Sequence, residues 1–208
     1  MNFSAIKNII FDLGGVIINL DMKRTFSAFA KATGKSIDEI QTSFFNQQIW
    51  QDHETGKLSD SALRAHLRTH YLQNISNEEI DTIWNALLLD IPIERIQLLQ
   101  HLKSKYRLLM LSNTNGIHEK HFTEILATTT GINTFDDLFD KVYYSHQIGM
   151  RKPDLQIFNY VLSDQNIQAS ETVFIDDNVD NIEAAQRLGI HTIHVVHPNT
   201  INELLANA

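Results

Sequence analysis

The chain contains no cysteine among its 208 residues. Disulfide bonds and thiolate chemistry are therefore excluded, and the composition fits a reducing compartment, so we expect a cytoplasmic protein. Basic residues are too few to balance the acidic ones, and the formal net charge is −8. This charge argues against a nucleic-acid-binding surface. Any anion-binding site must therefore be built locally, from backbone N–H groups, a lysine and a metal ion.

Long apolar runs are also missing. No stretch approaches the ~20 apolar residues of a membrane-spanning helix, and we expect no membrane partner. Near the N-terminus the apolar stretch is only Ile9 to Phe11, and Asp12 follows it directly. We therefore interpret this segment as a first strand and not as a secretion signal. Repeats, low-complexity tracts and linkers rich in Pro, Gly or Ser are absent as well, so the chain does not consist of tethered neighbouring domains.

Apolar runs typical of buried strands alternate with stretches of helical character. The strand signals lie at Ile6–Phe11, Arg107–Leu111, Lys141–Ser145, Thr172–Ile175 and Ile190–Val196. Helices are expected to begin near Pro92 and near Pro153, because proline suits the first helical turn. This alternation predicts an α/β fold, a doubly wound parallel sheet.

The connection between the first strand and the helix before the second is far too long for one helix. It contains two helix starts of capping-box form, Ser36 to Glu39 and Ser76 to Glu79. Apolar residues at helical spacing follow, such as Leu63 and Leu67. We therefore predict a small α-helical cap over residues 21–89, inserted into an α/β core made of residues 1–20 and 90–208.

Four short motifs carry the chemistry of the chain, and three of them place polar residues directly after an apolar run. They are IIFDLGG (9–15), LLMLSNTN (108–115), GMRKPD (149–154) and TVFIDDN (172–178). Parallel strands present their carboxyl ends at one edge of the sheet, where ligands bind. Asp12 as a carboxylate nucleophile, the Ser112 hydroxyl, Lys152 and the pair Asp176–Asp177 then converge. This set matches the needs of phosphoryl transfer with Mg²⁺.

Each motif taken alone also has a purely structural interpretation. Asp12 is then an ordinary turn residue, Ser112 and Asn113 cap a helix, and Lys152 is a solvated surface residue. Two neighbouring loop acids are costly after a buried strand unless a cation relieves them, which favours the functional interpretation of Asp176 and Asp177. The Gly14–Gly15 turn lets the backbone approach a ligand closely.

Together the four motifs resemble the haloacid dehalogenase superfamily, over essentially the whole chain. The likeness is closest to the bacterial sugar-phosphatase branch that hydrolyses α-D-glucose 1-phosphate. The resemblance implies that Asp12 is the nucleophile, that Ser112 and Asn113 hold the phosphoryl group and that Lys152 neutralises it. It also implies a set of metal and substrate contacts. Mg²⁺ would be held by Asp12, the Gly14 carbonyl and Asp177 with Asp176 assisting, and the substrate would contact Gly15 and Asn115 as well as Ser112, Asn113 and Lys152.

The sequence departs from the superfamily at Gly14, where most of its phosphatases have a second aspartate that protonates the leaving group. A missing general acid costs about 10²- to 10⁴-fold for a basic leaving group. That cost shrinks when the leaving oxygen is acidic, as it is in a sugar 1-phosphate. Asn181 also stands where an aspartate is frequent, which alters one outer metal contact. No other side chain in the four motifs is placed to donate this proton. His118, three residues after Asn115, is a candidate to reach the cleft mouth. Asp21 and His118 are candidates to substitute for the acid by way of water, although nothing in their spacing requires it.

The sequence thus predicts a Mg²⁺-dependent phosphatase for a small phosphorylated metabolite, a sugar 1-phosphate such as glucose 1-phosphate, acting through an aspartyl phosphate. One alternative is a metal-independent 2-haloacid dehalogenase, against which Asp176–Asp177 argues. Another is a catalytically weak module that binds a phosphorylated metabolite. The cap sets the substrate, with the Glu54–Gly56 loop and Asp21 as candidates, and the sequence does not define the oligomeric state.

Overall fold

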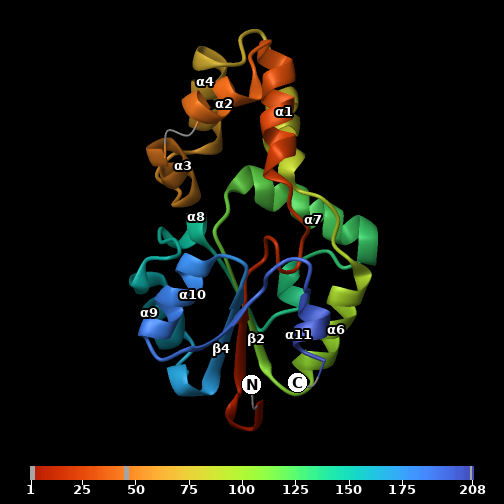
Figure 1. The fold of residues 1–208 in the computed structure, drawn as a ribbon, viewed down its shortest axis with the longest axis vertical. Helices are drawn as coiled ribbons and strands as arrows, with labels where there is room; N and C mark the ends of the chain where they lie inside the picture. Colours follow the sequence, from red (N-terminus) through yellow and green to blue (C-terminus); the bar gives the residue numbers. More distant parts are fainter. Residues whose placement is uncertain (1–2, 45–46, 207) are drawn as a thin grey trace.

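The computed structural model describes residues 3–44, 47–206 and 208. Within them, five parallel strands form one sheet in the order β3-β2-β1-β4-β5 (Figure 1). The strands are β1 (Asn8–Phe11), β2 (Arg107–Ser112), β3 (Lys141–Tyr144), β4 (Thr172–Asp176) and β5 (His191–His194). The predicted doubly wound parallel sheet is confirmed, and each strand begins and ends within two residues of its predicted position.

Helices cover both faces of the sheet. Successive residues of a strand point to opposite faces, so Ile9 and Phe11 join the core beneath α6 (Ile93–Lys103), α7 (Gly116–Thr130) and α11 (Ile201–Leu204). Ile10 instead packs with Phe158 of α9 (Leu155–Asp164) and Ile182 of α10 (Val179–Arg187). Both faces of the three central strands β1, β2 and β4 are almost entirely buried, and each of these strands reads as a nearly continuous apolar run.

A group of helices lies between β1 and α6 and stands above the sheet in Figure 1. Its members are α1 (Met22–Thr33), α2 (Ile37–Phe44), α3 (Gln47–Glu54), α4 (Asp60–His70), α5 (Asn77–Trp84) and the 3-10 turn η2 (Asn85–Leu87). Short elements complete the chain: α8 (Ser145–Ile148), η1 (Phe3–Ala5), η3 (Phe135–Asp137) and η4 (Ala169–Glu171). We call the helices from α1 to η2 the helical insertion.

The helical insertion has a hydrophobic core of its own. Phe29, Leu63 and Trp84 are buried there, and Ile117 of α7 joins the same cluster. Both expected capping boxes are present: the Glu79 N–H donates to Ser76 Oγ at 3.2 Å, and the equivalent bond joins Glu39 to Ser36. The division of the chain into residues 1–20, 21–89 and 90–208 stays a prediction.

The two prolines lie just outside the helices they were expected to begin. Pro92 is the N-cap of α6, and α9 begins only at Leu155, two residues after Pro153. Both helices therefore begin near the expected prolines, but neither proline lies in the first helical turn. Before α9, the Lys152 backbone bonds to the Asn113 side chain. No helix in the described part of the chain is long and apolar enough to cross a membrane.

Candidate active site

The polar residues of the four motifs meet at the carboxyl edge of the sheet. β1 lies between β2 and β4, so Asp12, Ser112 and Asp176 follow or end three adjacent strands. Their side chains are buried, as is that of Lys152, which the loop after α8 supplies. The parallel sheet is the basis for predicting that residues of all four motifs converge on one edge. In the structure, Asp12, Ser112, Lys152 and Asp176 lie at this edge.

Lys152 holds the centre of the site. Its Nζ donates hydrogen bonds to Asp12 Oδ1 and to Asp176 Oδ2, each at 2.7 Å, and only 1% of the residue is exposed. Burial alone would lower the pKa of Lys152, but the two carboxylates outweigh it, so the net shift is upward and the ammonium stays charged. A buried cation is thereby fixed beside the oxygen of the nucleophile.

Burial raises the pKa of Asp12 to about 7. The ammonium of Lys152 opposes this rise, and the charge of Asp176 adds to it. The backbone of Asp12 is held in place because its N–H donates to the Ile175 carbonyl of the neighbouring strand at 2.8 Å. A carboxylate of this basicity in a partly dry site is a competent nucleophile once a cation stabilises its charged form.

Both carboxylate oxygens of Asp176 accept hydrogen bonds from the protein. Oδ1 accepts from the Asn178 N–H at 2.7 Å and from Asn181 Nδ2 at 3.1 Å. Oδ2 accepts from Lys152 Nζ and again from Asn181 Nδ2, at 3.0 Å. Asn181 therefore donates to the carboxylate, where an aspartate would face it with a like charge. These contacts make Asp176 a support for Lys152.

The Gly14–Gly15 turn is shaped by its close neighbours. Gly15 has φ +71°, and a Cβ there would lie 2.2 Å from Asp177 Oδ2. Only glycine therefore lets the Asp177 carboxylate approach the turn. At Gly14 a Cβ would meet Leu20 Cδ1 at 2.6 Å. The space for a side chain at position 14 is filled by an apolar group.

Three carboxylates fit a divalent cation. Asp12, Asp176 and Asp177 each offer an oxygen, and these oxygens lie within 4.8 Å of one another. Burial, followed by the charge of Asp176, raises the pKa of Asp177, so a cation beside this carboxylate would stabilise its charged form. Hard oxygen donors at this spacing suit Mg²⁺. The residues present therefore fit the predicted metal.

The side chains at the end of β2 and after it differ in their hydrogen bonding. The Ser112 hydroxyl has no hydrogen-bond partner within the described ranges. In contrast, Asn113 is engaged on both sides: its Nδ2 donates to the Lys152 carbonyl, and its Oδ1 accepts from the Lys152 N–H, both at 2.9 Å. Asn115 caps α7 by accepting from the His118 N–H. Asn113 thus positions Lys152, and Asn115 positions the helix.

Ser145 supports the site, although none of the four sequence motifs contains it. Ser145, fully buried at the start of α8, accepts from the Thr114 N–H at 2.9 Å and donates to the Thr114 carbonyl at 3.1 Å. It fixes the loop that follows Ser112. A serine between a strand and a short helix is an ordinary turn residue in sequence, so only its contact across the fold reveals this role.

The two expected substitutes for a general acid are occupied elsewhere. His118 is buried against the helical insertion, stacked on Trp84 and hydrogen-bonded through Nδ1 to Asn85 Oδ1 at 2.7 Å. Burial lowers the pKa of His118 to about 3. The expectation that it reaches the cleft mouth is therefore wrong, because the cap helices cover it. Asp21 caps α1 by accepting from the Lys23 N–H.

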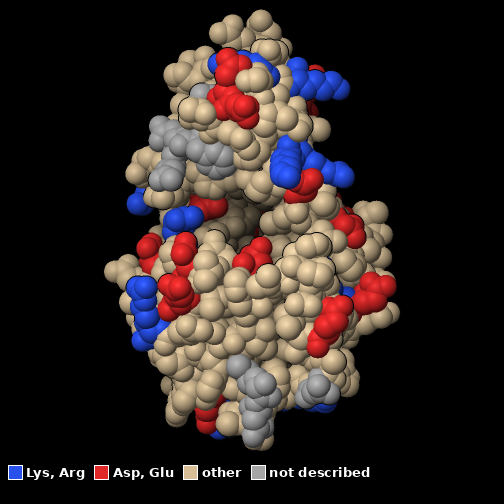
Figure 2. All heavy atoms as spheres, in the orientation of Figure 1, with Lys and Arg blue, Asp and Glu red and all other residues tan. Residues whose placement is uncertain are grey.

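The helical insertion also contacts the core beside Lys152. Arg151 Nε donates to Glu54 Oε2 at 3.0 Å, and Arg151 Nη2 lies 2.9 Å from the same oxygen in an ion pair. The expected substrate-contacting loop, Glu54–Gly56, thus lies next to the GMRKPD motif. Figure 2 shows a hollow between the helical insertion and the sheet part of the molecule, with acidic side chains around it.

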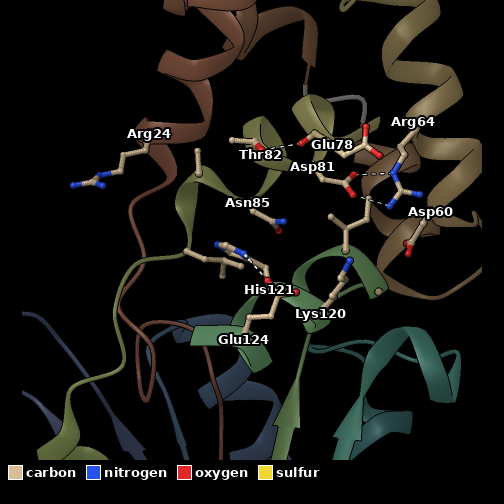
Figure 3. Close-up of a pocket in the computed structure, with 14 residues that line it drawn as sticks. Arg24, Asp60, Arg64, Glu78, Asp81, Thr82, Asn85, Lys120, His121 and Glu124 are labelled. Carbon is tan, nitrogen blue, oxygen red and sulfur yellow. Dashed lines mark hydrogen bonds and ion pairs between the residues drawn. The ribbon is translucent and has the colours of Figure 1, made fainter. Parts of the chain in front are cut away.

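A separate cavity of ≈ 570 Å³ lies between α1, α4, α5 and α7 (Figure 3). Charged side chains of both signs line it, among them the ion pair of Arg64 with Asp81. None of the four converging residues lines this cavity. Its volume therefore does not belong to the candidate catalytic centre.

Comparisons of sequence and structure identify the family and relatives of this chain. A family model described as a haloacid dehalogenase-like hydrolase matches residues 6–189. The D-ribitol-5-phosphate phosphatase of Bacteroides thetaiotaomicron is 31% identical over 187 residues, which cover 90% of each chain. The glyceraldehyde 3-phosphate phosphatase of Methanocaldococcus jannaschii is 30% identical over 203 residues, which cover 92% of this chain and 85% of that one.

A solved structure adds ligands to the comparison. It is a HAD family enzyme of Bacteroides thetaiotaomicron, in which an aspartate is replaced by alanine, in complex with magnesium and inorganic phosphate. It is 35% identical with a TM-score of 0.89, over 96% of this chain and 98% of that one. The chain belongs to the haloacid dehalogenase-like hydrolase family. The prediction of an enzyme of its phosphatase type is confirmed, whereas the finer likeness to glucose-1-phosphate phosphatases is not shown.

Proposed function

We propose that this protein is a Mg²⁺-dependent phosphatase that hydrolyses a small phosphorylated metabolite through an aspartyl phosphate at Asp12. The observation that carries the proposal is the buried Lys152 ammonium, held 2.7 Å from both Asp12 and Asp176. An amine fixed there balances the charge of the transferring phosphoryl group without reorganising during the reaction. The phosphatase relatives and the magnesium and phosphate bound by a solved relative support it.

The reaction has two displacements. In the first, an Asp12 oxygen attacks phosphorus and the bond from phosphorus to the ester oxygen breaks, so the alcohol leaves and takes its proton from water. In the second, water attacks the acyl phosphate, which releases inorganic phosphate and restores the Asp12 carboxylate. Lys152 and the Ser112 hydroxyl donate to the phosphoryl oxygens in both steps. Mg²⁺, when bound by Asp12, the Gly14 carbonyl and Asp177, supplies further positive charge.

We further propose that the preferred substrate is a sugar 1-phosphate such as glucose 1-phosphate. Leu20 fills the space beside Gly14, His118 is buried with its pKa lowered to about 3, and Asp21 caps a helix. None of these residues protonates a basic alkoxide. The rate should therefore depend steeply on the acidity of the leaving oxygen.

A second candidate is a phosphate ester on a primary carbon of a polyol. The similarity to a D-ribitol-5-phosphate phosphatase favours it. The deciding measurement is kcat/KM for glucose 1-phosphate, glucose 6-phosphate and ribitol 5-phosphate at one Mg²⁺ concentration. We expect the 1-phosphate to lead the 6-phosphate by at least about tenfold, within the range that a missing general acid costs. A lead for either primary ester would show that another group supplies the proton.

Three further measurements distinguish a phosphatase from a haloacid dehalogenase and from a binding module. Phosphate release that requires Mg²⁺ is expected, together with no halide release from 2-chloropropionate. Binding of phosphorylated metabolites without any turnover would instead indicate a binding module.

A further inference from the structure

An ion pair joins the helical insertion to the residue beside the catalytic lysine. Glu54 ends α3, and its Oε2 accepts a hydrogen bond from Arg151 Nε and forms an ion pair with Arg151 Nη2. Its other oxygen, Oε1, accepts from Trp50 Nε1 at 2.9 Å. The side chains are 13% and 25% exposed, so the pair is largely shielded from water and is not a typical surface ion pair. Glu54 is held from both sides.

The turn after Glu54 contacts the core at α8. Gly56 has φ +69°, and a Cβ there would lie 2.2 Å from the His146 carbonyl oxygen. Figure 1 shows α3 directly above α8, to which His146 belongs. The turn of residues 54–56 therefore touches the core segment that leads to Lys152 at two points, His146 and Arg151. This part of the helical insertion therefore packs against the core segment that carries Lys152.

Both cations of the GMRKPD motif are paired with carboxylates of the chain. Arg151 and Lys152 are the two cations of the GMRKPD motif, and each is matched by carboxylates of the chain itself: Glu54 for Arg151, and Asp12 with Asp176 for Lys152. An unmatched arginine would attract a second phosphate or carboxylate on the substrate. Because Glu54 neutralises the Arg151 guanidinium, a second anionic group of the substrate would gain little attraction from Arg151 and would be repelled by the Glu54 carboxylate.

We propose that Glu54 and Arg151 determine substrate specificity, selecting phosphate monoesters whose leaving group is uncharged and rich in hydroxyl groups. This inference rests on the proposed phosphatase function. The hydroxyl groups donate to the Glu54 carboxylate and accept from the guanidinium N–H groups that Glu54 leaves free. A leaving group with a carboxylate or a second phosphate is rejected, because a buried charge without a partner is unfavourable.

The test compares substrates that differ only in this charge. Glucose 1-phosphate is paired with glucuronic acid 1-phosphate, and glyceraldehyde 3-phosphate with 3-phosphoglycerate. For the parent protein we expect kcat/KM to favour the uncharged partner of each pair by at least about tenfold, equivalent to about 1.4 kcal/mol. In Glu54→Gln, which keeps the shape of the side chain but removes its charge, the preference should shrink at least about threefold, mainly through KM of the charged substrate.

The matched control is the ion pair of Arg64 with Asp81. It has similar geometry, 2.7 Å from Nε to Oδ1, but lies within the helical insertion at the separate cavity (Figure 3). Asp81→Asn should leave the preference unchanged. A folded and active Glu54→Gln with the parent's preference would overturn the inference. So would a parent that treats the two partners equally, an outcome that does not require the variant to fold. Failure of the parent to release phosphate from any of these esters, or from p-nitrophenyl phosphate, would instead remove the phosphatase function itself.

Discussion

Among single residues, Asp12 combines burial with a direct bond to a buried ammonium. Replacing it with asparagine keeps the shape of the side chain and leaves Lys152 paired with Asp176. We therefore expect Asp12→Asn to retain its fold and its thermal unfolding midpoint within a few degrees, but to lose at least about 10³-fold in kcat, because an amide does not attack phosphorus. Phosphate release and circular dichroism measure the two properties. Activity near the parent level would exclude Asp12 as the nucleophile.

Gly15 lies directly against Asp177, a predicted ligand of the metal. In Gly15→Ala the new methyl group would collide with the Asp177 carboxylate, at 2.2 Å from Oδ2, in addition to the strain of φ +71°. We expect the Mg²⁺ concentration for half-maximal activity to rise at least about tenfold, because Asp177 is pushed away from its position. The strain itself should cost about 1–2 kcal/mol of the free energy of unfolding.

The control for this change is Gly131→Ala. Gly131 has nearly the same conformation, with φ +75°, but a Cβ there would meet no atom of the described residues within 4 Å, and it ends α7 away from the site. The variant should lose about the same stability and keep the parent's Mg²⁺ dependence. An equal change of Mg²⁺ dependence in both variants would mean that Gly15 acts only through strain.

Among the elements, α5 of the helical insertion is short and depends on its first turn. Ser76 and Glu79 exchange hydrogen bonds as a capping box, with the Ser76 N–H donating to Glu79 Oε2 at 3.0 Å. We expect Ser76→Ala to lower the free energy of unfolding by about 1 kcal/mol, because a backbone N–H of the first turn loses its acceptor. Urea denaturation measures the loss. Ser163→Ala, at an exposed position in the last turn of α9, should change the value by less than about 0.5 kcal/mol. Equal losses in the two variants would contradict the capping role.

At the scale of the whole molecule, one of the contacts between the helical insertion and the core, on α7, is expected to be sensitive to pH. His118 is buried there with its pKa lowered from 6.5 to about 3. Unfolded chains take up a proton on this histidine below about pH 6.5, whereas the folded protein does not. The free energy of unfolding contributed by His118 is therefore present above pH 6.5 and falls as the pH drops toward 3. Between pH 7 and pH 5 the loss should be about 2 kcal/mol.

The measurement compares urea denaturation at pH 7 and pH 5 for the parent and for His118→Gln. The glutamine does not titrate, so the difference between the two pH values should be smaller in the variant by about 2 kcal/mol. Titrating groups that do not interact with His118 contribute equally to both proteins; His53 is not among them, because its charge also lowers the pKa of His118. The same pH response in parent and variant would show that His118 does not carry it.

The sequence by itself determined the sheet, the edge at which the catalytic residues meet and the family. Apolar runs that end in Asp12, Ser112 and Asp176 are local signals, and the geometry of parallel strands converts them into one site without knowledge of any other contact. The capping boxes of the helical insertion were predictable for the same reason, since both partners lie within four residues of each other.

Only the tertiary structure decided how the side chains around that site are used. The amide of Asn113 holds the Lys152 backbone, Asn181 donates to Asp176, and His118 is sealed beneath the helical insertion. Glu54 meets Arg151 across 97 residues of chain. Such pairings depend on the placement of distant segments in three dimensions, and a polar side chain has the same identity whether it faces a ligand or another part of the protein. Residue type and local spacing therefore identified the chemistry, while packing assigned each polar group its partner.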